Sequence, residues 1–376
     1  AAAPLIDEAE LVARLSAPPA QPAAAEPPAA TKEEETASAE AVASAGLGDQ
    51  HRRSLALRPW RRLPVQSEAV GSVCLAEDGV TVVTAGTSPE LRVTCGARAQ
   101  LLRAASAGVL RLSSCVQLRG SDRIVVGSWD ASLSVYSVGH GQLCGTLNRA
   151  HEDAVACLAA VRGKGGAAPS RMASGSWDTT VRLWELHPSG FGREPLQQFG
   201  DTMHHSRVLA VDGSGELVTC GTSDGMLALW DARGALVPVR ATRPHGAAAL
   251  SGVCLADAAQ AIVSCSVDGS IVASPLDGTE PTTLRPAGKG TGGAERSVVA
   301  LGDGSIVASA GDGGEVTLWD VGGGRALGTL AAGGERRAIA CLHAVDVDGG
   351  GWRLAAGLED GSCQMWYEGV EPEAAA

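Results

Sequence analysis

An aspartate in a short polar turn recurs along this chain at a nearly constant interval, and this period restricts the fold more than any other feature. The intervals are 48, 46, 44, 44 and 48 residues. The turn residues are Asp130, Asp178, Asp224, Asp268, Asp312 and Asp360. A degraded copy, Thr87-Ser88-Pro89-Glu90, precedes them. Small and apolar residues alternate on both sides of the turns, as half-buried antiparallel strands require. The chain therefore contains seven copies of one unit of short strands.

The third copy, residues 150–185, is the most complete. It predicts three strands at residues 154–158, 171–175 and 180–185, with Ser176-Trp177-Asp178 as the tight turn between the last two. One such sheet cannot bury both of its faces, so it needs neighbours, and each copy is long enough for four strands. We therefore predict an all-β fold, a seven-bladed β-propeller. Its blades are expected at residues 70–102, 109–147, 155–199, 208–239, 252–284, 298–330 and 338–367.

Four polar side chains of the third copy are expected to form one hydrogen-bonded chain: His151, Ser174, Asp178 and Trp184. A buried carboxylate is costly unless it accepts hydrogen bonds, and a histidine in the preceding loop can donate to it. The serine can donate to the other ring nitrogen and accept the indole N–H. The unit resembles one repeat of the WD40 family, which keeps a linked tetrad at these places. The resemblance implies a structural role for the tetrad and no catalytic one.

The other copies keep this pattern unevenly. The aromatic site of the third strand holds Trp184, Trp230, Trp319 and Trp366, with Trp319 one residue late relative to its aspartate. Tyr136 takes the place in the second copy and Ser274 in the fifth, while Cys220 stands where a tetrad hydroxyl is expected. The fifth copy keeps His245, Ser264 and Asp268 but has no tryptophan. We expect a full tetrad only in the third copy.

The two ends of the chain predict how the ring closes. Residues 1–50 are rich in Ala, Pro and Glu and contain no aromatic residue, so we expect a disordered arm, with a short helix over Pro4 to Leu15 as an open alternative. The seventh copy ends after its third strand. A strand from between Arg53 and Val65 should complete it, because a closed ring leaves no sheet edge exposed. We therefore assign residues 51–376 to a propeller closed by an N-terminal strand.

Charge limits the partners. The formal net charge of −12 argues against nucleic acid as a partner. A local basic cluster around Trp60 offers an alternative contact with a membrane or an acidic partner, beside its expected role as the closing strand. The cluster consists of Arg52, Arg53, Arg58, Arg61 and Arg62.

The cysteines predict the location. The ten cysteines form no CxxC pair and no signal peptide is evident, so we expect reduced thiols and a cytoplasmic location, with peripheral attachment to membranes as the alternative.

Two short segments superficially match ligand-binding loops. Residues 288–293 are glycine-rich, but they lack the spacing of a phosphate loop and no helix is expected to follow. Residues 346–350 match the start of a calcium loop, but Gly357 stands where the closing glutamate belongs. His204 and His205 lack evident further metal ligands. We therefore predict no cofactor, no metal site, no catalytic residue and no enzymatic activity.

Trp129 and Trp177 are the candidate partner-binding residues. Each stands directly before its turn aspartate in neighbouring copies, where the others have Ser223, Val267, Gly311 and Glu359, so the fold does not require an aromatic ring there. In WD40 propellers this position faces the top surface, where partners commonly bind. Tryptophan is enriched at binding hot spots, and two exposed indoles would form an apolar patch. The alternative is that both rings only pack against adjoining loops.

A closer resemblance extends over residues 112–186. The segments are Ser113-Ser114-Cys115-Val116, Gly127-Ser128-Trp129-Asp130, Ala150-His151-Glu152-Asp153 and Ser176-Trp177-Asp178-Thr179. They resemble the C-terminal propeller of BEACH-domain proteins, in the group around the factor associated with neutral sphingomyelinase activation. The resemblance implies a non-enzymatic scaffold that binds protein partners through its top face in membrane trafficking or signalling. The alternative is a substrate receptor or assembly subunit of another complex, such as a ubiquitin ligase or a ciliary or G-protein-type assembly.

Overall fold

The computed structural model describes residues 57–65, 68–87, 90–95, 98–103, 111–117, 120–162, 171–187, 190–192, 194–200, 206–233, 238–288, 293–332, 337–347 and 351–368. The predicted arm at residues 1–50, its alternative helix, and the basic residues Arg52 and Arg53 lie outside these ranges. The described part consists of strands and turns, so it offers no helix that could span a membrane.

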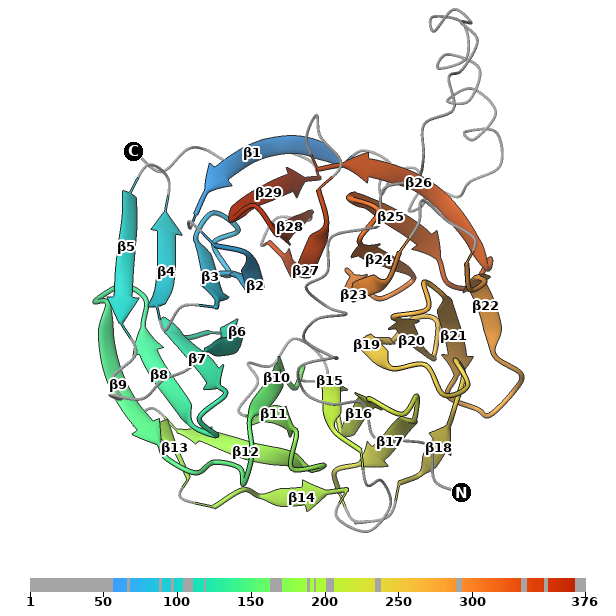
Figure 1. The fold of residues 1–376 in the computed structure, drawn as a ribbon, viewed down its shortest axis with the longest axis horizontal. Coiled ribbons are helices and arrows are strands. Elements are labelled where there is room, and N and C mark those ends of the chain that lie inside the picture. Colours follow the sequence, from blue (N-terminus) through green and yellow to red (C-terminus); the bar gives the residue numbers. More distant parts are fainter. Residues whose placement is uncertain are drawn as a thin grey trace, which may run out of the picture. The chain divides into compact units, whose positions relative to one another are not determined.

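The strands form seven antiparallel sheets, one for each copy of the repeat, which we call blades 1 to 7 (Figure 1). Blade 1 contains β2 (Val70–Leu75), β3 (Val82–Gly86), β4 (Glu90–Cys95) and β5 (Arg98–Arg103). Blade 2 contains β6 (Leu112–Gln117), β7 (Arg123–Ser128), β8 (Leu133–Ser137) and β9 (Gln142–Leu147). Blade 3 contains β10 (Val155–Ala160), β11 (Arg171–Ser176) and β12 (Val181–His187), and β12 pairs with both β13 (Gly190–Phe191) and β14 (Gln197–Phe199).

The remaining blades follow the same order from the centre outward. Blade 4 contains β15 (Val208–Ser214), β16 (Leu217–Thr222), β17 (Leu227–Asp231) and β18 (Arg240–Thr242). Blade 5 contains β19 (Leu250–Ala256), β20 (Ala261–Ser266), β21 (Ile271–Pro275) and β22 (Thr282–Arg285). Blade 6 contains β23 (Glu295–Leu301), β24 (Ile306–Gly311), β25 (Glu315–Asp320) and β26 (Arg325–Ala331). Blade 7 contains β27 (Ile339–Asp346), β28 (Trp352–Leu358), β29 (Ser362–Tyr367) and the first strand of the chain, β1 (Arg58–Pro64).

The seven blades close into a ring, and the prediction of a seven-bladed propeller is confirmed. The first strand of each blade contacts the first strand of the next, and β27 of blade 7 contacts β2 of blade 1 (Figure 1). The predicted closing strand is also present. β1 pairs antiparallel with β29, from Arg58 opposite Tyr367 to Pro64 opposite Ser362.

Glycines at one position of the second strand let neighbouring blades approach each other closely. A Cβ atom on Gly175 of blade 3 would lie 2.5 Å from Cγ1 of Val208, the first residue of blade 4. The same contact closes the ring, since a Cβ on Gly357 would lie 2.5 Å from Cγ1 of Val70. Overpacking of this kind typically costs about 1–3 kcal/mol. The repeated glycine therefore follows from the approach of the next blade.

In blades 3, 4, 6 and 7 the tryptophan of the third strand packs toward the preceding blade. Trp230 of blade 4 is fully buried, and its ring centroid lies 5.4 Å from that of Phe199 in blade 3. In blade 5, Ser274 replaces the indole, and its buried hydroxyl has no hydrogen-bond partner among the described residues. A small hollow lined by Ser274, Leu227, Leu229 and Ile262 lies beside it. The missing ring thus leaves an imperfectly filled interface between blades 4 and 5.

Polar side chains link the first strands of neighbouring blades. The first strand has a sheet partner on one side only, so several of its N–H groups need another acceptor. At five of the interfaces between neighbouring blades, which we call seams, this acceptor is a side chain of the neighbouring blade, at 2.8–3.2 Å from the nitrogen. The acceptors are Ser72, Ser114, Asp212, Ser297 and His343. These contacts account for polar residues on otherwise apolar strands.

Candidate functional site

The upper end of the ring, defined here as the end that carries the turn between the second and third strands of each blade, holds both groups of candidate residues. We call this turn the upper turn. Its first residue donates its backbone N–H to the residue that precedes the first strand of the same blade. In blades 2, 3 and 4 these bonds join Trp129 to Arg111, Trp177 to Ala154 and Ser223 to Arg207, at 2.9–3.0 Å.

The structure brings the four tetrad residues of blade 3 together in the predicted order. Nδ1 of His151 lies 2.8 Å from Oδ2 of Asp178, and its Nε2 lies 2.7 Å from Oγ of Ser174. The indole N–H of Trp184 donates to the same Oγ at 2.8 Å. The tetrad thus links the loop before the first strand to the second strand, the upper turn and the third strand.

Electrostatics assign the protons in this chain. Burial lowers the pKa of His151, so the imidazole is neutral at pH 7, donates from Nδ1 to Asp178 and accepts at Nε2 from Ser174. Burial alone would raise the pKa of Asp178, but the hydrogen bonds that it accepts from His151, the N–H of Glu152 and Thr180 hold it well below its usual range. The ring nitrogens and the Ser174 hydroxyl are all engaged within the blade. We therefore interpret the tetrad as a structural element.

Blade 5 keeps part of the tetrad in an altered form. Nε2 of His245 lies 2.8 Å from Oγ of Ser264, as in blade 3. Its Nδ1, however, lies 2.5 Å from Oγ of Ser270, and that hydroxyl donates to Asp268. A serine therefore stands between the histidine and the aspartate, an arrangement that the sequence did not predict.

The repeat alignment was wrong by one residue in blade 6. Trp319 is not late, because its indole donates to Ser309 at 3.0 Å with the same ten-residue separation as Trp184 and Ser174. Asp312 is the residue out of place. Its N–H donates to Ala294, so Asp312, rather than Gly311, is equivalent to Trp129 and Trp177. The slip arose because the turn aspartate served as the reference for the alignment.

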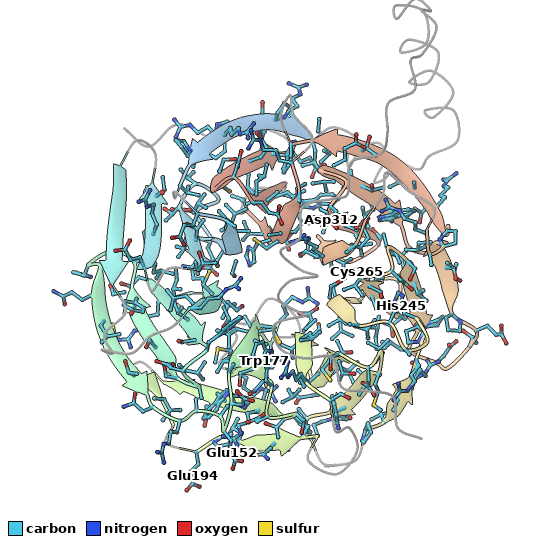
Figure 2. The ribbon with its side chains drawn as sticks, viewed as in Figure 1. Glu152, Trp177, Glu194, His245, Cys265 and Asp312 are labelled. Carbon is cyan, nitrogen blue, oxygen red and sulfur yellow. The ribbon has the colours of Figure 1, made fainter. Side chains whose placement is uncertain are left out.

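Trp129 and Trp177 meet at the upper end of blades 2 and 3. Their ring centroids lie 4.9 Å apart with the planes inclined by 50°, and both side chains are half-buried. Such tilted pairs are favourable beyond the area that they bury. Each ring therefore packs on its neighbour and keeps an exposed part, and partner binding through the two rings stays a prediction. Figure 2 shows Trp177 toward the centre of the ring, whereas Glu152 lies near its outer rim.

Two arginines flank this indole pair. The guanidinium of Arg111 lies 4.8 Å from the Trp129 ring centroid, and that of Arg207 lies 4.6 Å from the Trp177 ring centroid. The four side chains form a continuous row, Arg111, Trp129, Trp177 and Arg207, which we call the indole row. Both arginines precede the first strand of their blade, in blades 2 and 4 respectively.

Sequence reasoning missed the two arginines of the indole row. Neither belongs to a motif, and each is separated in the sequence from the tryptophan that it contacts by at least 18 residues. The equivalent residues in blades 3, 5, 6 and 7 are alanines: Ala154, Ala249, Ala294 and Ala338. A comparison of this one position across the aligned copies would have revealed both arginines.

The basic cluster near the start of the propeller has a structural role in the described residues. Trp60 and Leu63 of β1 pack against the core between blades 7 and 1. Arg62 donates to Asp360 at 2.7 Å, which joins the closing strand to the upper turn of blade 7. The exposed residue Arg58 leaves contact with a membrane or acidic partner as an untested prediction.

A central cavity of about 260 Å³ lies between the first strands. Its lining contains the polar residues Glu77, Asp212 and His343 beside small apolar side chains. Arg162 partly neutralises this lining, with its guanidinium 3.1 Å from Oδ2 of Asp212. No group of three or more potential metal ligands occurs in the part of the chain that the structure describes. His204 and His205, most of the 288–293 segment and part of the 346–350 segment lie outside that part.

Comparison with known proteins identifies the repeat. The family model of the WD domain, G-beta repeat, matches residues 141–185 and 194–231. The F-box/WD repeat-containing protein 9 of Bos taurus is 28% identical over 187 residues, which cover 47% of this chain and 37% of the relative. The Periodic tryptophan protein 2 homolog of Schizosaccharomyces pombe is 35% identical over 31% of this chain and 13% of its own length.

A third relative is the Ribosome biogenesis protein YTM1 of Chaetomium globosum, 27% identical over 32% of this chain and 25% of its own length. The chain thus matches well under half the length of each of these relatives. None of the three is named as a BEACH protein, so they do not support the finer resemblance drawn from the sequence. The two matched segments lie within blades 2 to 4, around the complete tetrad and Trp230. The chain is therefore a seven-bladed β-propeller that carries WD40 repeats.

Proposed function

We propose that this chain is a non-enzymatic interaction subunit of a multiprotein complex and that a partner protein docks on Trp129 and Trp177. One observation carries the proposal: two half-buried indoles pack 4.9 Å apart at a position where blades 4 to 7 have Ser, Val, Asp and Glu. The propeller is built without this pair, so its presence needs another reason. Tryptophans with an apolar face and a hydrogen-bonding N–H are frequent anchors of protein interfaces.

The relatives favour an assembly subunit over a trafficking scaffold. Their names place them with F-box/WD proteins and with ribosome biogenesis, which are both settings of multiprotein assembly. The BEACH-type role in membrane trafficking, together with membrane attachment through the basic cluster, remains a prediction from the sequence. An upstream BEACH domain in the full-length gene would favour that role, and its absence there would remove it.

Proximity labelling with the whole chain as bait tests the proposal. The wild type is compared with the double variant Trp129→Ala/Trp177→Ala and with Val267→Ser, which alters the equivalent, exposed position of blade 5. We expect a set of neighbours that the double variant loses and the Val267 variant keeps, with unchanged circular dichroism and thermal unfolding. Recovery of the same neighbours by all three proteins would contradict the proposal.

A cytoplasmic location is part of the proposal. The ten cysteines are all free, and most are buried within strands, which fits a reducing compartment. Microscopy of the tagged full-length protein tests this, and a signal confined to the secretory pathway would contradict it.

A further inference from the structure

The two cations of the indole row have no anionic partner. Within the described residues, neither Arg111 nor Arg207 forms an ion pair or a side-chain hydrogen bond, and each stacks on an indole instead. The exposed carboxylates Glu152 and Asp153 precede β10 between them in the sequence, yet neither pairs with either guanidinium. The row therefore presents two positive charges that no other described residue neutralises.

Arginines elsewhere at the upper end behave differently. Arg243 lies 2.6 Å from Oδ2 of Asp224, and Arg62 lies 2.7 Å from Oδ2 of Asp360. Arg296 contacts both Asp312 at 2.6 Å and Glu359 at 2.9 Å. In a chain with a net charge of −12, carboxylates are plentiful. The missing partners at the indole row are therefore a local feature of this surface.

Stacking leaves the donors of a guanidinium available. A guanidinium that lies over an aromatic ring can still donate to a carboxylate, because its N–H bonds lie in the plane of the group. Nε of Arg111 is buried and has no hydrogen-bond partner among the described residues. Burial also lowers the pKa of Arg111, because its charge has been partly withdrawn from water without compensation. An incoming anion would remove this penalty.

We propose that the indole row binds an acidic segment of the partner protein, with one carboxylate on Arg111, another on Arg207 and an apolar side chain on the indoles between them. This inference rests on the proposed function. Successive contacts along the row are 4.8, 4.9 and 4.6 Å. An extended chain rises ~3.3 Å per residue, so roughly four to five residues of the partner span the row.

A nucleic acid is the competing ligand, because indoles stack on bases and arginines bind phosphates. The net charge of −12 opposes a polyanion, and the exposed Glu152 and Asp153 add negative charge to the loop before β10. A short peptide with two carboxylates concentrates its charge on the two arginines and avoids this repulsion. The peptide is therefore the better match.

Selection from a random peptide display library tests the inference. Wild type, Arg111→Gln/Arg207→Gln and Trp129→Ala/Trp177→Ala are each used as bait, and all three are checked for unchanged thermal unfolding. We expect the wild type to enrich peptides in which two acidic residues, about four positions apart, flank an apolar one. The arginine variant should lose the acidic enrichment, and the tryptophan variant should enrich none of these peptides. Synthetic peptides from the wild-type selection should bind at least tenfold more weakly when both acids are changed to amides, and more weakly as salt rises.

The outcomes separate the two proposals. Tryptophan-dependent peptides without acidic enrichment, or with enrichment that survives in the arginine variant, would overturn the acidic partner but leave the docking surface intact. Failure to select any tryptophan-dependent peptide would overturn the inference, while proximity labelling would still judge the docking surface. Arginine-dependent binding of a fluorescent single-stranded oligonucleotide, tighter than that of the selected peptides, would assign the row to nucleic acid.

Discussion

On one side of the upper end, in blades 2 and 3, the first residue of the upper turn is Trp129 or Trp177, whereas in blades 6 and 7 it is Asp312 or Glu359. Trp177 and Asp312 lie on opposite sides of the central opening (Figure 2). Asp312 and Glu359 both bind Arg296, so that side is neutralised from within. We call the upper end of blades 2 and 3 the indole side and that of blades 6 and 7 the ionic side. On the indole side, Arg111 and Arg207 lie over the rings, and neither has a counter-ion in the part of the chain that the structure describes. The same backbone position can therefore hold either a self-contained ion cluster or an open surface.

The largest effect is expected when a tryptophan of the indole side is replaced by the carboxylate found on the ionic side. Trp177→Glu copies Glu359 and places a carboxylate where it can pair with Arg207. We expect binding of a peptide selected on the wild type to weaken by about 100-fold or more, because a hot-spot ring is lost and one cation is neutralised. Fluorescence polarisation measures the affinity.

Val267→Glu is the matched control for this substitution, since it introduces the same charge at the equivalent, exposed position of blade 5, where the residue before the first strand is Ala249 and not an arginine. It should change the affinity by less than about threefold. Unaltered peptide binding by the Trp177 variant would show that the two sides do not differ in function.

A second substitution tests whether the ionic side is stabilised by its own contacts. The Arg296 side chain is only 14% exposed, and its removal in Arg296→Met leaves Asp312 and Glu359 without this partner. We expect the free energy of unfolding to fall by about 2 kcal/mol, because the arginine is partly buried and bridges two carboxylates. Peptide binding should not change. Urea unfolding followed by fluorescence measures the loss.

Arg207→Met is the counterpart on the indole side. Among the described residues, this substitution leaves no carboxylate without its ion-pair partner. The methionine can still pack on the Trp177 ring, so the free energy of unfolding should fall by less than about 1 kcal/mol. Equal losses for the two variants would mean that Arg207 has a hidden structural role, and the contrast between the two sides would fail.

The sequence predicted the fold well because its evidence was periodic. Seven copies of a four-stranded unit bury both faces of every sheet when they close into a ring. The seventh copy has only three strands of its own, so a strand from before Val70 was expected to complete it. The alignment failed at blade 6, where Asp312 stands one residue early and the strand register, not the turn, keeps Trp319 in place. Register is a property of paired strands, so a single motif could not reveal it.

The candidate site was only half predictable. Trp129 and Trp177 were visible because an aromatic residue at a turn is unusual. Arg111 and Arg207 were not, because they belong to no motif and differ from the alanines of the other copies only at one position before the first strand. That they lie over the indoles is seen only in three dimensions. Likewise, the acceptors Ser114 and His343 appeared to be ordinary strand residues until the neighbouring N–H groups were placed.

The interfaces between blades 2 and 3 and between blades 7 and 1 should contribute differently to the pH dependence of stability. The seam between blades 2 and 3 is joined by Ser114, whereas the seam between blades 7 and 1 is joined by His343, whose Nδ1 accepts the N–H of Leu75. Burial lowers the pKa of His343 to about 4. The unfolded chain therefore binds more protons below its ordinary pKa of about 6.5, and stability is lost as the pH falls from there toward 4.

We expect His343→Asn, which can still accept the hydrogen bond but cannot titrate, to reduce this loss by about 1–2 kcal/mol between pH 7 and 4. His151 and His245, whose pKa values burial also lowers, should keep part of the slope. Urea unfolding at a series of pH values measures it, with the exposed His140→Asn as a control. An unchanged slope in the His343 variant would show that this seam does not depend on the neutral ring.

The smallest effect concerns the backbone of the upper turns. The third turn residue has positive φ in blades 2 to 7, and it is glycine at Gly225, Gly269, Gly314 and Gly361. On the indole side it is Ala131, with φ 66°, and Thr179, with φ 71°. A β-branched residue in this left-handed region is strained, by roughly 1–2 kcal/mol. Such strain tends to persist where function constrains the sequence.

Thr179→Gly should therefore raise the free energy of unfolding by about 0.5–1 kcal/mol, since the relief of strain exceeds the added entropy of the unfolded glycine. Gly361→Thr, the reverse change on the ionic side, should lower it by a similar or larger amount. Thermal and urea unfolding of the two variants give both values. If Thr179→Gly instead destabilises the protein, the hydroxyl and methyl of Thr179 contribute more than the strain costs. The indole side would then be held in place by its own packing, and strain would no longer distinguish it from the ionic side.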